Sequence, residues 1–202
     1  MISPSAKQFV QDVFQSLNRE VWIITAATAD QRGGLLATWV MQVSLDTERP
    51  CLIAGLAPNH FTTRLIKQSG KFAAHLLKDD QAELALSFAI GSGRDHDKLA
   101  DVSVRQEPAG PPILIDCRAW LNCKVYARLV TGDRIYFWAD VLEGDLITPR
   151  TPLLCEQQLI LEANESQQNA LRKNLQEDRD HLAPHQAMWR NQLPEELEFR
   201  PS

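Results

Sequence analysis

A charged, glycine-rich loop at residues 91–99, Gly-Ser-Gly-Arg-Asp-His-Asp-Lys-Leu, has the residue types best suited to binding an anion. Arg94 can bind a phosphate through two parallel N–H groups, and Lys98 can add a second positive charge. Asp95 and Asp97 can hold these two cations in place. Taken alone, a run of this kind is more often a solvated loop whose charges pair with one another.

A second polar segment lies at residues 59–63, Asn-His-Phe-Thr-Thr, where the pattern predicts the start of a helix. The free N–H groups and the dipole of a helix start favour a bound phosphate. The side chains of Asn59, Thr62 and Thr63 could complete its coordination. The alternative is that Asn59 is an ordinary helix cap. His60 is given no chemical role.

A third polar segment lies at residues 37–44, Ala-Thr-Trp-Val-Met-Gln-Val-Ser. A ring cofactor that leaves water needs hydrogen-bond partners for its polar edge, and Thr38, Gln42, Ser44 and the backbone between them could supply these. Trp39 adds a flat apolar surface. The alternative is a half-exposed strand whose side chains simply alternate between two faces.

Taken in chain order, at residues 37–44, 59–63 and 91–99, the three segments resemble the flavin reductase-like family. The FMN-binding split barrel of that family has a hydroxyl-bearing segment ending in Val-Ser, then Asn/Ser-His-x-Thr, then Gly-x-Gly/Ser-Arg-Asp-x-Asp-Lys-Phe/Leu. The resemblance covers residues 21–146. It implies a mainly β fold with short helices, namely a split β-barrel of the FMN-binding type. It also implies a homodimer with the flavin near the subunit interface.

The resemblance further implies an enzyme of the NAD(P)H:flavin oxidoreductase type that passes electrons through bound FMN. FAD is the alternative flavin, and NAD(P)H is the expected co-substrate. We expect the flavin ring and ribityl chain to contact Thr38, Trp39, Val40 and Ser44. We expect the phosphate end to contact Asn59, Thr62, Thr63, Arg94 and Lys98. Because the cofactor carries out the chemistry, no side chain is assigned as a catalytic acid or base.

The sequence departs from the family's pattern at residues 38–39 and at residue 134. Thr38 and Trp39 stand where the family usually has two serines, and Arg134 follows Gly-Asp where many members have histidine. Arginine cannot act as a neutral imidazole, although it could pair with a nucleotide phosphate. A second hypothesis is therefore an FMN-carrying electron-transfer or sensor protein without efficient NAD(P)H turnover. A third is a split barrel that has lost its flavin.

Apolar and β-branched residues predict the strands that position these segments. A hairpin is expected at residues 21–28 and 35–45, and further strands at 51–56, 72–77, 119–130 and 135–142. Helical spacing predicts helices at 9–17, 61–69 and 80–90. Many strands with short helices between them favour a small antiparallel barrel.

The sequence becomes polar from residue 162, with a narrow apolar stripe that includes Leu171, Leu175 and Leu182. We expect two parts: a flavin reductase-like split-barrel domain at 1–160 and a C-terminal helical extension at 161–202. The extension is expected to pack on the barrel or on a partner subunit. Pro184 is expected to break its helix between the two nearby histidines, so no metal site is predicted.

The composition is that of an ordinary globular protein, with 202 residues, 44% hydrophobic residues and a net charge of -5. The acidic balance and the lack of a basic cluster argue against nucleic acids and anionic membranes as partners. We expect a cytoplasmic protein, because residues 1–7 do not resemble a signal peptide. The four cysteines form no Cys-x-x-Cys pair and are expected to be reduced, buried thiols.

Overall fold

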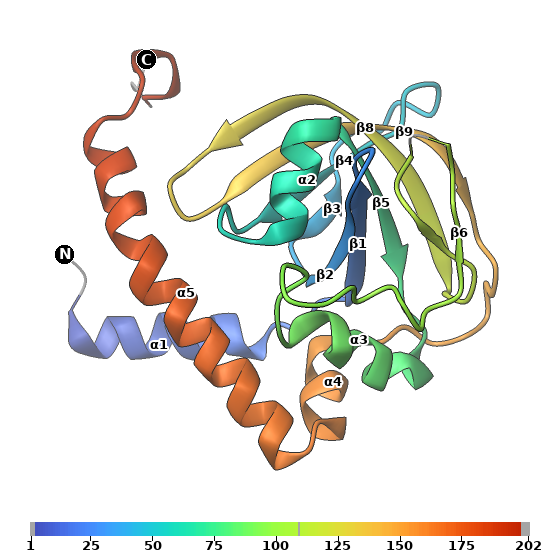
Figure 1. Cartoon of the computed structure of the whole chain (residues 1–202). Helices are drawn as coiled ribbons and strands as arrows, with labels where there is room; N and C mark the ends of the chain where they lie inside the picture. The colour runs from blue at the N-terminus through green and yellow to red at the C-terminus, as the bar shows by residue number, and fades with distance from the viewer. Residues whose placement is uncertain (1–2, 109, 199–202) are drawn as a thin grey trace.

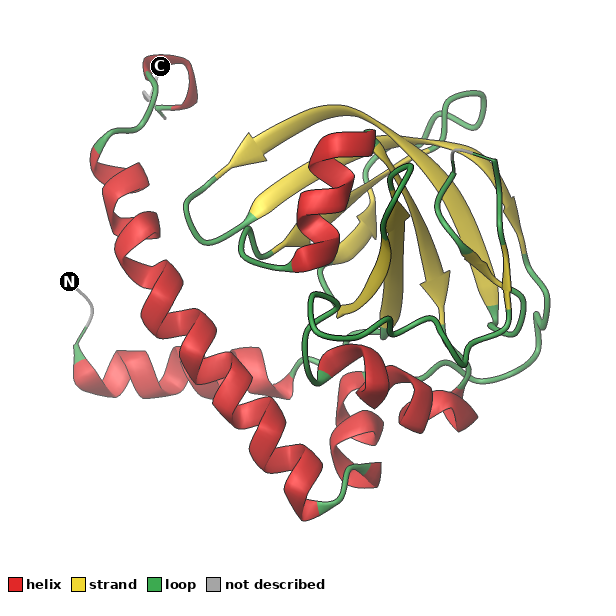
Figure 2. Ribbon diagram, in the orientation of Figure 1, coloured by secondary structure: helices red, strands yellow, loops and turns green. Residues whose placement is uncertain are grey.

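The computed structural model describes residues 3–108 and 110–198. Seven antiparallel strands form one sheet that curls into a half-barrel, in the order β2-β1-β5-β8-β9-β4-β3 (Figures 1 and 2). Their bounds are β1 Trp22–Ala27, β2 Arg32–Ala37, β3 Val40–Gln42, β4 Cys51–Leu56, β5 Lys71–Leu76, β8 Ala119–Val130 and β9 Ile135–Asp145. A second small sheet pairs β6 (Val104–Arg105) with β7 (Ile113–Leu114). The prediction of a mainly β chain with short helices is confirmed.

Strands β2 and β3 lie at opposite edges of the large sheet, although only Thr38 and Trp39 separate them in the sequence. The sheet must therefore curl until its two edges approach each other, and these two residues lie at the seam. The backbone N–H of Gly55 in β4 donates to the carbonyl oxygen of Trp39 at 2.8 Å. The sequence predicted one strand over 35–45; the structure breaks it because the chain crosses here from one edge to the other.

The two faces of the sheet are covered by different helices. On one face, α2 (Phe61–Ser69) packs Leu65 and Ile66 with Ile24 and Phe137. On the other, α3 (Ala82–Ala89) and α4 (Glu156–Glu162) pack Phe88 and Leu159 with Ile23 and Trp120. Ile23 and Ile24 are neighbours in β1 but pack on opposite faces of the sheet. This is the two-residue period of a strand that is buried on both faces. A short 3-10 turn, η1 (Asp79–Gln81), precedes α3.

His75 in β5 is completely buried and joins three strands. Its Nδ1 donates to the carbonyl oxygen of Ile23 in β1 at 3.0 Å, and its Nε2 accepts from the backbone N–H of Leu114 in β7 at 3.1 Å. Burial lowers the pKa of His75 to about 4. The ring is therefore neutral, because a proton on Nε2 would face the Leu114 N–H.

Two long helices lie outside the barrel. The first, α1 (Pro4–Ser16), has no buried residue and exposes an apolar stripe. The last described helix, α5 (Glu165–Asn191), runs past the barrel toward the turn between β8 and β9 (Figure 1), and η2 (Glu195–Leu197) follows it. None of the helices in the described ranges is long and apolar enough to cross a membrane.

Pro184 lies inside α5, so the prediction that it breaks this helix is wrong. A proline in a helix removes one backbone hydrogen bond, and packing on either side can hold the helix together. Here Leu182 is buried, and the backbone of His185 packs against Gly132 of the β8–β9 turn. The helix therefore continues for two more turns past Pro184 against the barrel.

Candidate functional site

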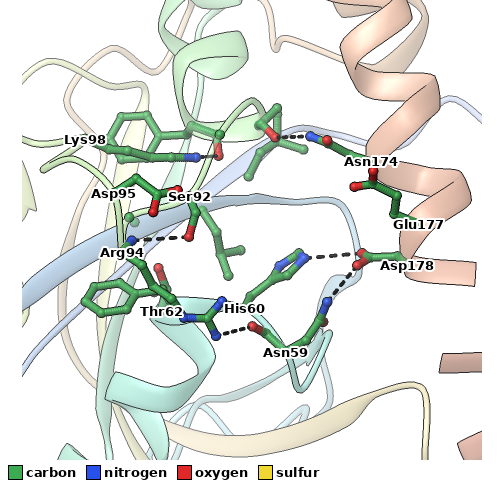
Figure 3. Close-up of a pocket in the computed structure, with 18 of the residues that line it drawn as sticks. Asn59, His60, Thr62, Ser92, Arg94, Asp95, Lys98, Asn174, Glu177 and Asp178 are labelled. Atoms are coloured by element: carbon green, nitrogen blue, oxygen red, sulfur yellow. Dashed lines mark hydrogen bonds and ion pairs between the residues drawn. The ribbon is translucent and has the colours of Figure 1, made fainter. Parts of the chain in front are cut away.

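A cavity of about 600 Å³ opens between the barrel and α5 (Figure 3). Its walls come from strand β2, the start of α2, the loop at 91–98 and the middle of α5. Two of the three polar segments singled out in the sequence therefore line one space. A volume of this size is typical of a small-molecule site.

The start of α2 forms one end of the cavity. Its N-cap residue is His60, and no side chain in the described structure makes a capping hydrogen bond there. The alternative that Asn59 caps this helix is wrong, because the Asn59 amide donates instead to Asp178 of α5 at 2.9 Å. The amide oxygen of Asn59 is buried and has no partner among the described residues. This end of the cavity thus offers helix N–H groups and an unused acceptor.

Thr62 and Thr63 occupy different positions on α2. Thr62 is almost completely buried and still lines the cavity. Thr63 is completely buried, is not among the described residues that line the cavity, and its hydroxyl has no partner among them. Of the two, only Thr62 therefore presents atoms to a ligand in the cavity.

The charged loop crosses the cavity wall and does not pair its charges internally. Gly91 begins it with a φ of 74°, a conformation that favours glycine. Arg94 donates to the carbonyl oxygen of Asn59 at 2.6 Å, which joins the first and second polar segments. Asp97 pairs with Arg32 of β2 at 2.8 Å. The alternative of a loop with self-paired charges is therefore not what the structure shows.

Lys98, in the charged loop, lies half-buried against the C-terminal end of α3. Its ammonium group donates to the carbonyl oxygen of Phe88 at 2.8 Å and also lines the cavity. Burial lowers the pKa of Lys98 to about 8. An anion in the cavity would favour the charged form of this lysine and would raise that pKa again.

The third segment lines a smaller cavity of about 130 Å³ at the barrel seam. Thr38 and Trp39 border it, and it shares Leu35, Leu36, His60, Arg134 and Asp178 with the large cavity. The two cavities are therefore neighbours with shared walls, and we refer to them together as the trough. The Arg134 guanidinium carbon lies 4.8 Å from the centre of the Trp39 ring. Trp39 and Arg134, which both depart from the family pattern, thus contact each other through a cation–π interaction.

Val40 and Ser44 lie apart from this trough. Val40 is buried in the core, and Ser44 accepts a hydrogen bond from the backbone N–H of Asp46 at 3.0 Å. Neither is among the described residues that line the two cavities. Val40 points inward because side chains alternate between the two faces once β3 begins. Ser44 lies beyond the end of β3 at Gln42.

Sequence reasoning missed the contribution of α5. Asn174, Glu177 and Asp178 face the cavity from this helix (Figure 3). Asp178 accepts from Asn59 and lies 3.2 Å from Nε2 of His60. No local signal could have found this contact, because the polar composition of α5 is that of a surface helix and its partners lie more than a hundred residues away.

The described residues offer little basis for other kinds of site. None of them form a group of three or more His, Cys, Asp or Glu side chains able to hold a metal ion. All four cysteines are free thiols, and burial raises the pKa of Cys117 and of Cys123 to about 12. Those two thiols are therefore unreactive.

Comparison with protein families gives one match: the model for the flavin reductase like domain matches residues 14–159. The reductase component of a 4-nitrophenol 4-monooxygenase/4-nitrocatechol 2-monooxygenase from Rhodococcus opacus is 32% identical over 144 residues, which cover 71% of this chain and 75% of that protein. Diflavin flavoprotein A 1 of Synechocystis is 26% identical over 61% of this chain. The match spans 22% to 25% of the length of three such diflavin flavoproteins.

Solved structures share the fold. An NADH:FAD oxidoreductase from Streptomyces globisporus superposes with a TM-score of 0.66 at 20% identity, over 77% of this chain and 91% of that one. An FMN-binding protein from Thermus thermophilus gives a TM-score of 0.60 at 19% identity, over 65% of this chain and 72% of that one. The predicted split-barrel fold is confirmed. Helix α5 begins after the last residue that the family model matches.

Proposed function

This chain belongs to the flavin reductase-like domain family, and we propose that its trough binds FMN and passes electrons from NAD(P)H through it. The observation that carries the proposal is the convergence of residues 38–39, 59–62 and 91–98 on two adjacent cavities that share part of their walls. When bound, the flavin would supply the redox chemistry, accepting a hydride and passing on its electrons. The residues of the chain bind it and orient it.

The trough fits FMN in both shape and chemistry. An elongated space suits a flat ring joined to a chain that ends in a phosphate. The start of α2 lacks a side-chain cap, and the buried amide oxygen of Asn59 can accept a hydrogen bond from a ligand hydroxyl. Arg94 and Lys98 bring positive charge to the same end. These groups favour an anion together with hydroxyl donors.

We assign the phosphate end to Asn59, His60, Thr62, Arg94 and Lys98, and the ring end to Thr38 and Trp39. Arg94 fixes the turn before α2 through the Asn59 carbonyl and still has donors left for a phosphate. The indole of Trp39 lies beside the seam and offers a flat surface to the ring. This assignment leaves out Val40, Ser44 and Thr63, since their side chains lie away from the trough.

The choice of NAD(P)H as reductant is supported by the names of two similar proteins, a monooxygenase reductase component and an NADH:FAD oxidoreductase. We propose FMN rather than FAD because the groups able to bind a phosphate gather in one place, at the start of α2 and in the loop at 91–98. We place the protein in the cytoplasm, where its free thiols stay reduced.

The test is a visible spectrum of the purified protein with FMN, followed by anaerobic addition of NADH and, separately, NADPH. We expect FMN fluorescence to be quenched on binding and the visible flavin band to bleach with at least one nucleotide. Flavin fluorescence that the protein leaves unchanged, together with a spectrum identical to that of free FMN, would refute flavin binding.

The contact between Arg134 and Trp39 favours a second candidate function, an FMN-carrying electron-transfer or sensor protein. Arg134 covers one face of Trp39 and occupies the ring end of the trough, where a nicotinamide would need to stack. This candidate predicts that bound FMN stays oxidised with both nucleotides and bleaches with dithionite. The anaerobic experiment therefore separates the two functions.

We further propose that the chain forms a homodimer. Helix α1 presents Phe9 and Phe14, which are 69% and 60% exposed, on one apolar stripe. A contiguous apolar face of this kind is typical of an interface. Light scattering coupled to size-exclusion chromatography should give twice the mass of 22.8 kDa, and a mass of one chain would contradict the proposal.

A further inference from the structure

The anion-binding end of the trough already has an occupant from the chain itself. Asp178 of α5 extends to the start of α2, where one carboxylate oxygen accepts from the Asn59 amide at 2.9 Å (Figure 3). The other lies 3.2 Å from Nε2 of His60. The side chain of Asp178 is only 23% exposed. A carboxylate of the chain itself thus binds the Asn59 and His60 side chains, which a phosphate at the start of α2 would also contact.

Asp178 is held there as an anion. The hydrogen bond from His60 keeps the pKa of Asp178 below its usual range, the Asn59 amide adds to this, and Arg134 contributes through its charge. Burial opposes them. Because a carboxylate and a phosphate accept from the same donors, both cannot occupy this end at once, and their negative charges repel at short range.

Helix α5 keeps Asp178 close to this position. Asn174, one turn earlier, donates to the carbonyl oxygen of Ala89 at the end of α3. Leu182, one turn later, is 3% exposed. The backbone of α5 is therefore held on both sides of Asp178, and its carboxylate yields to a ligand by rotating its side chain.

We propose that Asp178 is a specificity-determining residue that competes with the terminal phosphate of the flavin for Asn59 and His60. This inference rests on the proposed function. A flavin with the phosphate must displace the carboxylate, whereas riboflavin, which lacks the phosphate, need not. Asp178 therefore lowers the affinity for FMN and not that for riboflavin. FMN then binds and dissociates during turnover, as a substrate does.

The opposite role for Asp178 makes the opposite prediction. If the carboxylate served only to orient Asn59 and His60 for the ligand, its removal would weaken the binding of FMN. The sign of the change in FMN affinity therefore separates a competitor from a positioning residue.

The experiment measures the dissociation constants of FMN and riboflavin by quenching of flavin fluorescence. Asp178→Asn keeps the shape of the side chain and removes its charge, and Asp178→Ala removes its contacts. Glu177→Gln is the matched control, because Glu177 lines the same cavity and makes neither contact with the start of α2. Circular dichroism confirms that each variant keeps its helices.

We expect Asp178→Asn and Asp178→Ala each to tighten FMN binding by about tenfold, the effect of removing one charge-assisted competitor. Riboflavin should change by less than about twofold, and Glu177→Gln should change either flavin by less than about threefold, because its charge is more exposed.

An FMN affinity that is unchanged or lower in both Asp178 variants would overturn the inference, and so would an equal gain for riboflavin. If the wild type binds riboflavin and FMN equally well and the variants do the same, the trough binds flavin but Asp178 does not compete. If no form binds either flavin, the proposed function itself fails, and the inference with it.

Discussion

Arg94 connects two segments that are more than thirty residues apart. Its guanidinium group donates to the Asn59 carbonyl, and that hydrogen bond fixes the loop at 91–98 relative to the start of α2. The side chain is exposed and packs in no core, so its contribution belongs to the cavity. Lys98 also has a structural role, because its ammonium group donates to the Phe88 carbonyl oxygen and caps the C-terminal end of α3.

Replacement of Arg94 by alanine is expected to weaken FMN binding by about tenfold, the typical effect of losing one charge-assisted hydrogen bond. The free energy of unfolding should change by less than about 0.5 kcal/mol, because exposed side chains contribute little. Arg64→Ala is the matched control: Arg64 is also exposed, but it pairs with Gln31 outside the large cavity. Equal FMN affinity in the two variants would remove Arg94 from the site.

Among the structural elements, β5 is held by a titratable group. His75 satisfies two backbone groups with a neutral ring, and its pKa of about 4 lies below the ordinary value of 6.5. The unfolded chain therefore binds one more proton than the folded chain between these pH values. The contribution of the neutral His75 ring to stability is fully present above pH 6.5 and is lost as the pH falls toward 4.

In this pH range the free energy of unfolding is expected to fall by up to about 1.4 kcal/mol per pH unit because of His75. Urea unfolding at several pH values measures this slope. His75→Gln, which cannot titrate, should lose that part of the slope while other acidic groups contribute to both proteins alike. A native imidazole that titrates near its ordinary pKa in an NMR experiment would contradict the assignment.

The turn between β8 and β9 contacts α5 through Gly132. Gly132 has a φ of 88°, and a Cβ there would lie 2.4 Å from the carbonyl oxygen of His185 in α5. Gly132→Ala is expected to lower the free energy of unfolding by about 2 kcal/mol and to loosen α5. Urea unfolding and limited trypsin digestion within α5 measure the two effects.

Gly70→Ala is the control for this variant. Gly70 has a φ of 67°, and its Cβ would meet nothing within 4 Å, so the substitution introduces backbone strain alone. It should cost about 1 kcal/mol and leave α5 as resistant to trypsin as in the wild type. Equal digestion of α5 in the two variants would show that Gly132 does not hold this helix.

The strands and short helices were largely predictable because apolar periodicity records burial directly. Two features were not. The break at Thr38 and Trp39 lies inside a stretch whose pattern predicts one strand, and only the closure of the sheet requires it. Helix α5 passes through Pro184 because packing on the barrel compensates for the lost hydrogen bond. Both depend on contacts distant in sequence, which local patterns do not contain.

The candidate site was also predictable only in part. The motifs at 59–63 and 91–98 identified the side chains Asn59, Thr62, Arg94 and Lys98 that line the large cavity. They could not indicate which neighbouring residues point away from it, because that depends on strand register and helix face. Nor could they indicate Asp178, which reaches the same place from a helix beyond the family's own domain.

At the scale of the whole molecule, closure of the sheet and the path of α5 together build the trough. The curl brings the Thr38–Trp39 seam toward α2, and α5 then forms the outer wall along the side of the barrel (Figure 1). The family's domain thus supplies the inner walls and the C-terminal helix supplies the outer one.

A crystal structure of the protein grown with FMN tests the proposed flavin site. We predict difference density for one flavin in the trough, with its phosphate next to Asn59 and Arg94 and its ring beside Trp39. Density for FMN at any other place on the molecule, or a trough that stays free of flavin at saturating FMN, would rule out this site.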